Sequence, residues 1–172
     1  MKLLIGLGNP GEKYKNNRHN VGHHFVDFLL DKLTSYELTS LDLKLVKTDC
    51  FMNLSGEFVK KILKKHQNID INDLYIAHDD LDIPLGKFKI DKGTGPRLHN
   101  GIKSIEKALK SKNFWRIRIG VDNPSTRFTR SGQVRIDGEK YVLSDFTKNE
   151  KTSLDKVFVE IIKKVEEMSS ST

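Results

Sequence analysis

Apolar residues along the chain fall into two alternating kinds of pattern, which predict strands and helices in turn. Strands are predicted by short apolar or alternating runs at residues 2–7, 43–46, 74–77, 87–90 and 115–121. Amphipathic helices are predicted by helical spacing of apolar residues at 21–33, 58–63, 102–109 and 154–168. This alternation predicts an α/β fold: a single three-layer domain over residues 1–172, with a mixed, mostly parallel central sheet flanked by helices.

Polar residues mark several of the expected boundaries. Asn53 is a candidate cap for the second helix. The residues His78-Asp79-Asp80 are expected to close the strand that begins at Leu74. Residues 122–140 predict a long polar surface loop, with a short hairpin around residues 134–136.

The length and the cysteine content narrow the class of protein. A chain of 172 residues can bury a core of its own without a disulfide or a structural metal. Cys50 is the only cysteine, so no intrachain disulfide can form, and this suits a reducing compartment. We expect neither a signal peptide nor a membrane span, because no apolar run approaches about 18 residues.

The net charge of +7 and the pI near 9.4 favour an anionic partner, with nucleic acid the first candidate. Lysine dominates the basic residues, so a general bias in composition explains the charge about equally well. Charge alone therefore leaves the partner open.

Four polar clusters follow predicted strands or open predicted helices, at residues 6–20, 51–56, 78–82 and 99–101. In open α/β sheets, binding sites form beyond the carboxyl ends of the strands, so these clusters are expected to converge. His19 is a candidate general base, and an aspartate of the third cluster could orient it. Asn100 could hold a carbonyl or a developing oxyanion. Each cluster also has an ordinary explanation as a surface turn or a helix cap.

The motifs that are missing limit the chemistry. The glycines at residues 6–11 match a dinucleotide loop only in part and are not followed by the lysine of a phosphate loop. No second group of histidines or cysteines stands at metal-ligand spacing near residues 78–82. No nucleophile elbow is present, and Cys50 has no obvious activating partner. Water activated by a histidine is therefore favoured over a covalent nucleophile.

The order and spacing of five motifs closely resemble bacterial peptidyl-tRNA hydrolases. The motifs are GLGNPG (6–11) with Tyr14 and RHNVG (18–22), FMNLSG (51–56), HDDLD (78–82) with Pro84 and Gly86, HNGIKSI (99–105) and FWRIRIG (114–120). The resemblance covers roughly residues 1–121 and 141–168.

The resemblance implies a role for several residues. His19 is expected to activate the attacking water and Asp79 to orient and polarise it. Asn9, Asn53 and Asn100 are expected to hold the substrate, with Asn100 supporting the tetrahedral intermediate. The substrate cleft is also expected to include Tyr14 and Met52.

The resemblance also implies the partner and the setting. Members of the family are cytoplasmic monomers that need no metal or organic cofactor and that release tRNA from stalled or aborted translation. Their basic residues clamp the 5′ phosphate of tRNA, and the matching positions here are Lys89, Lys92, Lys103 and Arg118.

The chain departs from the family pattern in three places. Arg97-Leu98 stands where a glycine pair is usual, the stretch before Met52 is shorter, and residues 122–140 are longer and more basic. Two alternatives therefore stay open. One is a relative that binds RNA without catalysis. The other is a generic α/β hydrolase or nucleotide-binding protein.

Overall fold

The computed structural model describes residues 1–33, 42–128 and 135–170. Five strands form one sheet in the order β2-β1-β3-β5-β4. They are β1 (Lys2–Gly6), β2 (Leu43–Lys47), β3 (Leu74–Pro84), β4 (Phe88–Lys92) and β5 (Trp115–Asp122). β4 alone runs antiparallel to its neighbour, so the sheet is mixed and mostly parallel as predicted.

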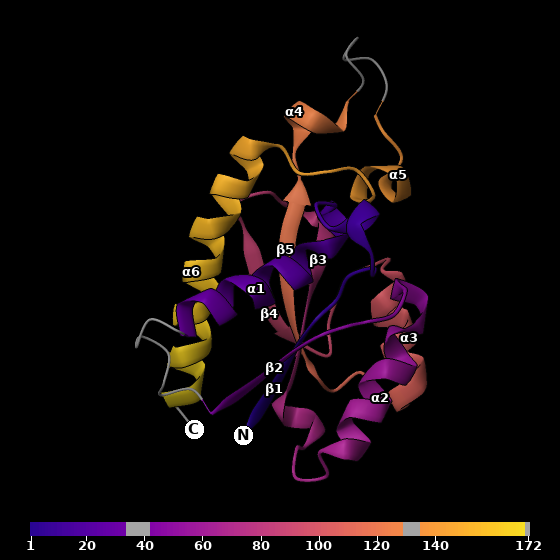
Figure 1. Ribbon diagram of the computed structural model, residues 1–172, viewed down its shortest axis with the longest axis vertical. Helices are drawn as coiled ribbons and strands as arrows, with labels where there is room; N and C mark the ends of the chain where they lie inside the picture. Colours follow the sequence, from indigo (N-terminus) through magenta and orange to yellow (C-terminus); the bar gives the residue numbers. More distant parts are fainter. Residues whose placement is uncertain (34–41, 129–134, 171–172) are drawn as a thin grey trace.

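Helices cover both faces of this sheet. The longer ones are α1 (Val21–Leu33), α2 (Ser55–Lys65), α3 (Asn100–Leu109) and α6 (Lys148–Ser170). Two short helices, α4 (Pro124–Arg127) and α5 (Gly138–Val142), lie beyond the end of β5. In Figure 1, α1 and α6 lie on one side of the sheet and α2 and α3 on the other. The expected three-layer α/β architecture is confirmed.

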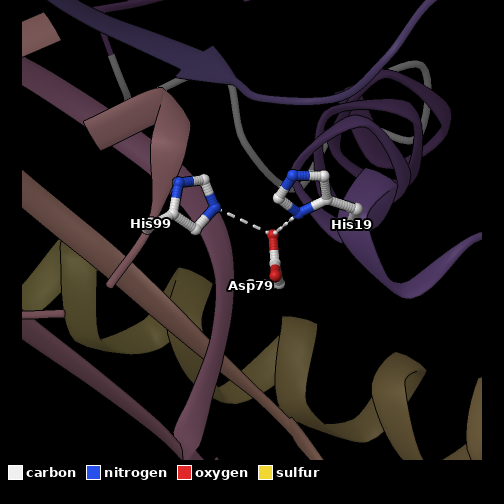
Figure 2. Close-up of side chains that lie close together, drawn as sticks. All are labelled: His19, Asp79 and His99. Carbon is white, nitrogen blue, oxygen red and sulfur yellow. Dashed lines mark hydrogen bonds and ion pairs between the residues drawn. The ribbon is translucent and has the colours of Figure 1, made fainter. Parts of the chain in front are cut away.

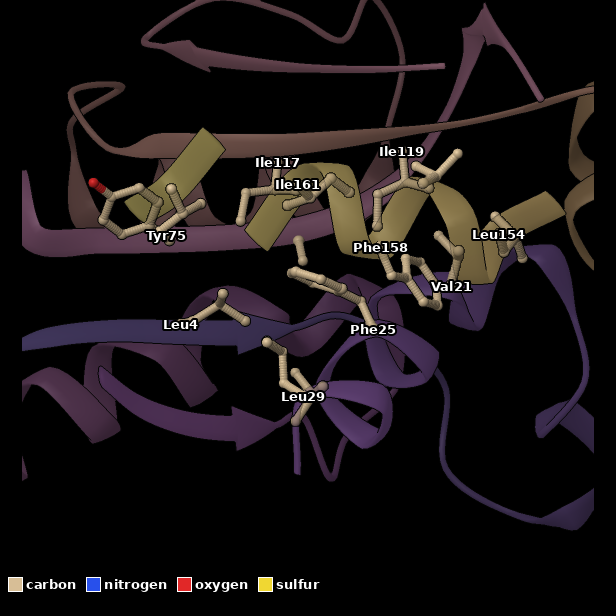
Figure 3. Packing of buried hydrophobic residues seen from close by; sticks show 14 of the residues in the cluster. Leu4, Val21, Phe25, Leu29, Tyr75, Ile117, Ile119, Leu154, Phe158 and Ile161 are labelled. Atoms are coloured by element: carbon tan, nitrogen blue, oxygen red, sulfur yellow. The ribbon is translucent and has the colours of Figure 1, made fainter. Parts of the chain in front are cut away.

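Each face of the sheet has its own apolar core. On one face, Phe25 of α1 and Phe158 of α6 pack together against the sheet, with ring centroids 5.2 Å apart (Figure 3). On the other face, Val59 of α2 and Ile105 of α3 pack over the apolar side chains of β1 and β3. Burial of these residues on both faces explains why the central strands read as continuous apolar runs.

β3 is longer than the sequence pattern predicts. We expected His78-Asp79-Asp80 to end it, but these residues continue to pair with Arg118, Ile119 and Gly120 of β5. Backbone hydrogen bonding does not depend on side-chain polarity, so the strand continues wherever the buried polar groups find partners.

Two further boundaries differ from the prediction. Asn53 does not cap α2, because a 3₁₀ turn, η3 (Met52–Leu54), precedes that helix and Asn53 lies inside the turn. Residues 122–140 are not simply a loop, since Asn123 caps α4 and Asp137 caps α5 through side-chain hydrogen bonds. Phe128 forms a β-bridge with Arg135, whereas residue 134 of the predicted hairpin lies outside the described residues.

A buried ion pair joins the two halves of the chain next to His19. Arg18 and Glu150 are each 2% exposed, and Arg18 Nη2 lies 2.7 Å from Glu150 Oε2. Arg18 Nη1 also donates to the carbonyl oxygen of Asp145 at 2.7 Å, and its guanidinium lies 4.3 Å from the ring centre of Tyr141. The turn η2 (Arg18–Asn20) is thereby tied to the start of α6.

Glu150→Gln tests how much this ion pair stabilises the fold. Removing one partner leaves the charge of Arg18 buried and unpaired, so we expect the free energy of unfolding to fall by about 3–5 kcal/mol. Urea denaturation measures the loss. Lys164→Gln removes an ion pair with Glu167 in which both side chains are more than half exposed, and it should cost less than about 1 kcal/mol. Equal losses in the two variants would contradict a stabilising role for the buried pair.

Candidate active site

His19 and His99 converge on the carboxylate of Asp79. His19 lies in η2 just before α1, Asp79 lies in the middle of β3, and His99 is the residue that caps α3. His19 Nδ1 is 2.8 Å and His99 Nε2 is 2.9 Å from the same oxygen, Asp79 Oδ1 (Figure 2). Residues 60 and 20 positions away along the chain thus meet at one buried carboxylate.

The hydrogen bonds determine which nitrogen of each ring carries a proton. His99 Nδ1 accepts from the backbone N–H groups of Gly101 and Ile102, so its Nε2 must carry the hydrogen that it donates to Asp79. His19 Nδ1 likewise donates to Asp79, which leaves Nε2 as the basic nitrogen of a neutral His19. His19 Nε2 has no hydrogen-bond partner within the described part of the chain, and the side chain is 12% exposed.

The local charges prepare His19 to take up a proton. Burial by itself lowers the pKa of His19, but the negative charge of Asp79 and the hydrogen bond to it outweigh burial, so the pKa is raised above 6.5. Burial would raise the pKa of Asp79, yet His19 and His99 hold it well below its usual range. Asp79 therefore stays ionised and stabilises the imidazolium form of His19.

His78 is completely buried and packs against His99. Its Nδ1 donates to the backbone carbonyl of Asp79 at 2.7 Å, and its ring meets the ring of His99 edge-on at 4.8 Å between centroids. Complete burial, followed by the electrostatic effect of the neighbouring His99, lowers the pKa of His78 well below 6.5. His78 is therefore a neutral spacer and not a second base.

Two asparagines hold the loop after β1 against η2 and η3. The backbone N–H of Asn9 donates to Asn20 Oδ1, and Asn20 Nδ2 donates back to the Asn9 carbonyl, both at 2.9 Å. Asn9 Oδ1 accepts from the backbone N–H of Met52 at 2.8 Å. Neutral amides thus connect the segments that carry His19 and Met52 without adding charge beside His19.

Asn53 and Asn100 are both exposed. Asn53 lies in η3, which precedes α2, and Asn100 is the first residue of α3. Ser104 Oγ donates to the Asn53 carbonyl at 2.8 Å, which joins η3 to α3. A Cβ atom at Gly101 would lie 2.6 Å from Met52 Sδ, so glycine at this position lets the Met52 side chain pack closely on the start of α3. Asn100 directly follows His99 in the sequence, and Asn53 directly follows Met52.

Tyr14 packs against Phe51, the residue before Met52. Its ring meets that of Phe51 edge-on at 6.1 Å between centroids. Phe51 is half exposed and directly precedes Met52. The structure therefore places Tyr14 beside the segment that carries Met52.

The four predicted phosphate-binding residues do not all lie together. Lys89 and Arg118 line one cavity of about 570 Å³, which Arg97 also lines. Arg118 is held there by Asp80 and Asp91, each at 2.8 Å. Lys103 is exposed in the first turn of α3.

Lys92 is the last residue of β4, whereas Lys89 lies near its start. Lys92 pairs in register with Trp115, over whose ring its Nζ lies at 5.5 Å, and it donates to Asn72 Oδ1 at 2.7 Å. The amino end of β5 begins at Trp115, whereas His19 and Asp79 lie toward the carboxyl ends of the parallel strands. The structure does not bring Lys92 to the cavity of Lys89 and Arg118.

His19, Asp79 and His99 are also the one group of three possible metal ligands within residues 1–33, 42–128 and 135–170. One ring nitrogen of each histidine lies at hydrogen-bond distance from the same carboxylate oxygen. Two ordinary N–H···O hydrogen bonds explain this geometry without a metal ion. A larger depression of about 660 Å³ lies between α1 and α6 and is lined by neither His19 nor Asp79. The histidine–aspartate cluster, and not the larger depression, is therefore the candidate catalytic site.

Comparison with known proteins identifies the family. The family model described as peptidyl-tRNA hydrolase matches residues 3–172. The chain belongs to the peptidyl-tRNA hydrolase family. This confirms the resemblance found in the motifs and the enzyme class expected from it, an ester hydrolase.

Relatives and solved structures agree over most of the chain. Peptidyl-tRNA hydrolases from a Sulfurihydrogenibium species and from Prochlorococcus marinus are each 40% identical, over 91% and 97% of this chain and 85% and 88% of theirs. A crystal structure of peptidyl-tRNA hydrolase from Acinetobacter baumannii is 30% identical and superposes with a TM-score of 0.78, covering 96% of this chain and 87% of that one. The fold of the family is thus preserved here.

Within the described ranges, no helix combines the length and the apolar character that crossing a bilayer requires.

Sequence reasoning missed two residues of the site. The motifs contain His99 and Asn20, but the sequence does not predict that His99 bonds to Asp79 or that Asn20 bonds to Asn9. Both stand beside predicted site residues, His99 next to Asn100 and Asn20 next to His19. That adjacency was the available signal, but only the folded structure shows which groups their side chains reach.

The pKa of His19 can be measured directly by following its ring signals in an NMR titration. In the native protein we expect a pKa above 6.5, because Asp79 outweighs burial. In Asp79→Asn the compensating charge is gone while burial remains, so the pKa should fall below 6.5. His66, which follows α2, serves as the control and should titrate alike in both proteins. An unchanged His19 pKa in the variant would contradict the coupling.

Proposed function

We propose that this protein hydrolyses the ester between a peptide and the 3′ end of its tRNA, using water activated by His19. The observation that carries the proposal is the bond from His19 Nδ1 to Asp79 Oδ1, which leaves Nε2 free and basic. We further propose that the protein acts in the cytoplasm as a monomer, with peptidyl-tRNA as its partner and without a cofactor. In this role it would recycle the tRNA that stalled or aborted translation leaves attached to a peptide.

The first step is proton transfer from water. Neutral His19 accepts the proton at Nε2 while the water oxygen attacks the ester carbonyl. The resulting imidazolium is stabilised by ionised Asp79, whose other neighbour, His99, holds the carboxylate in place. The proton then passes from His19 to the departing ribose oxygen, which restores the neutral base.

The asparagine side chains would stabilise the developing negative charge and orient the substrate. The exposed side chain of Asn100 offers an N–H donor to the oxyanion that develops on the ester carbonyl. Asn53 and the free amide group of Asn9 would orient the peptide and ribose on either side of Met52, with Tyr14 at the rim. An ester suits this arrangement because its alkoxide leaves more easily than an amine.

The state of Cys50 supports direct attack by water. Burial, followed by the neighbouring charge of Asp49, raises the pKa of the Cys50 thiol, so little of it is in the nucleophilic thiolate form at neutral pH. A covalent step through Cys50 is therefore not part of the proposal.

Recognition of the RNA is proposed to begin at the cavity of Lys89 and Arg118. Arg118 donates to Asp80 and Asp91 through Nε and Nη1, which orients its remaining guanidinium nitrogen. Lys89 and Arg97 line the same cavity, and a phosphate there would find cations on several sides. Lys103 would add charge from α3, whereas Lys92, paired with Asn72, would act only through its longer-range field.

His19→Ala tests the base. We expect the rate of release of peptide from N-blocked aminoacyl-tRNA to fall by about 10²–10⁴-fold, because general-base catalysis typically contributes that much. Affinity for tRNA should stay within about twofold, since His19 does not contact the proposed phosphate site. Both are measured on purified protein, hydrolysis by single turnover and affinity by fluorescence anisotropy.

The native protein is the reference for this experiment. Hydrolysis by the variant at the native rate would remove His19 from the mechanism. If the native protein binds tRNA but does not turn over, the chain is an RNA-binding relative and not a hydrolase.

Asn100→Ala tests the oxyanion donor. Losing one preorganised donor should lower kcat by about 10²–10³-fold while KM changes little, because the bond forms fully only in the transition state. His99, the residue that caps α3, is untouched, so the helix should keep its stability. A rise in KM at constant kcat would instead assign Asn100 to ground-state binding.

A further inference from the structure

Acidic residues are distributed unequally between the two helical layers. The α2–α3 layer contains six lysines and two glutamates: Lys60, Lys61, Lys64, Lys65, Lys103 and Lys107, with Glu57 and Glu106. The α1–α6 layer also contains six lysines but seven carboxylates: Asp27, Asp31, Glu150, Asp155, Glu160, Glu166 and Glu167. α2 and α3 have 11 and 10 residues, whereas α1 and α6 have 13 and 23. The α2–α3 layer therefore carries the same number of lysines on shorter helices, with fewer acids beside them.

The six lysines of the α2–α3 layer are available for a ligand. Five of them are exposed and Lys60 is half-buried. Among the described residues, none of the six has a carboxylate within ion-pair distance. Glu106 does not neutralise them, because it is paired with the buried guanidinium of Arg116 at 2.8 Å.

Close packing of α2 on α3 joins these lysines into one surface. The backbone N–H of Gly56 donates to Ser104 Oγ at 2.9 Å, and a Cβ atom at Gly56 would lie 2.1 Å from the Ser104 carbonyl oxygen. Lys60 follows Gly56 by one helical turn and so lies on the same side of α2. Figure 1 shows α2 and α3 side by side. Lys103 is next to Ser104 in the sequence, so each helix has a lysine close to the contact.

This surface starts at the proposed active site and leads away from it. α2 follows directly on η3, which holds Met52, and α3 begins at Asn100. The 11 residues of α2 rise by roughly 15 Å from first to last. An RNA or DNA duplex carries roughly one charge per 1.7 Å of its axis, so a helix of this length can face several phosphates.

Helix stability explains only part of the pattern. Lys64 and Lys65 lie in the last turn of α2, where cations stabilise the helix dipole. Lys60, Lys61 and the lysines of α3 do not all gain from that effect. A polyanion bound along both helices accounts for the whole set.

We propose that the exposed lysines of α2 and α3 bind the double-stranded stem of the tRNA whose 3′ end is held at His19. The inference rests on the proposed function, since it assigns the surface to the same substrate. The bound RNA is expected to be a duplex, because the 3′ end that carries the ester adjoins the base-paired stem of the tRNA. The lysines extend outward from the ester site, in the direction that the stem would take. The α1–α6 layer, with its excess of carboxylates, faces away from the RNA.

Matched double variants test this surface. Lys61→Gln/Lys64→Gln removes two cations from α2, and Lys156→Gln/Lys163→Gln removes two exposed cations from α6. Each protein is titrated with deacylated tRNA at several salt concentrations. The α2 pair should weaken binding by roughly three- to tenfold, as expected for two exposed ion pairs, and should reduce the salt slope by about two. The α6 pair should change binding by less than about twofold.

Hydrolysis of a stem-free substrate separates this inference from the proposed function. All three proteins should cleave an N-blocked aminoacyl ester of the CCA trinucleotide at the same rate, because that substrate lacks a duplex. Equal weakening of tRNA binding by both pairs, or by neither, would overturn the inference even if the ester is cleaved. If no protein cleaves the ester but the α2 pair alone weakens tRNA binding, the proposed function fails and the RNA surface stands.

Discussion

The organisation of this molecule follows from the burial of one carboxylate, Asp79, in the middle of a central strand. A charge in that position is costly unless donors surround it. His19 and His99 provide them from two different elements, and both reach the same oxygen. The need to satisfy Asp79 therefore explains why η2 and the start of α3 come together at β3. It also explains why the pKa of His19 is raised although the ring is largely buried.

The supports around this carboxylate use two kinds of interaction. Close to the base they are neutral, since Asn9 and Asn20 bond backbone groups without changing the charge near His19. A buried ion pair, Arg18 with Glu150, also ties the residue before His19 to α6. The charge of Arg18 is thus neutralised by Glu150 where both are buried. This arrangement holds His19 firmly while leaving its proton affinity to Asp79.

The helical layers on the two faces of the sheet differ in core packing and in charge. The α1–α6 side packs the larger aromatic core and has slightly more carboxylates than lysines. The α2–α3 side begins at the site and displays a lysine surface with few acids. A three-layer fold makes this division possible, because the sheet separates the two charge environments while both remain attached to the same strand ends.

The sequence by itself determined the alternation of strands and helices, the family, and the residues His19 and Asp79 as candidates. Those conclusions rest on periodicity and motifs within a few neighbouring residues, which are local properties. Only the tertiary structure decided that β3 continues through Asp79, that His99 caps α3 and shares the carboxylate, and that Lys92 lies apart from Lys89 and Arg118. These features depend on which distant segments pack together. Ring orientation, strand pairing and the separation of two lysines on one strand follow from that packing, and no local pattern encodes them.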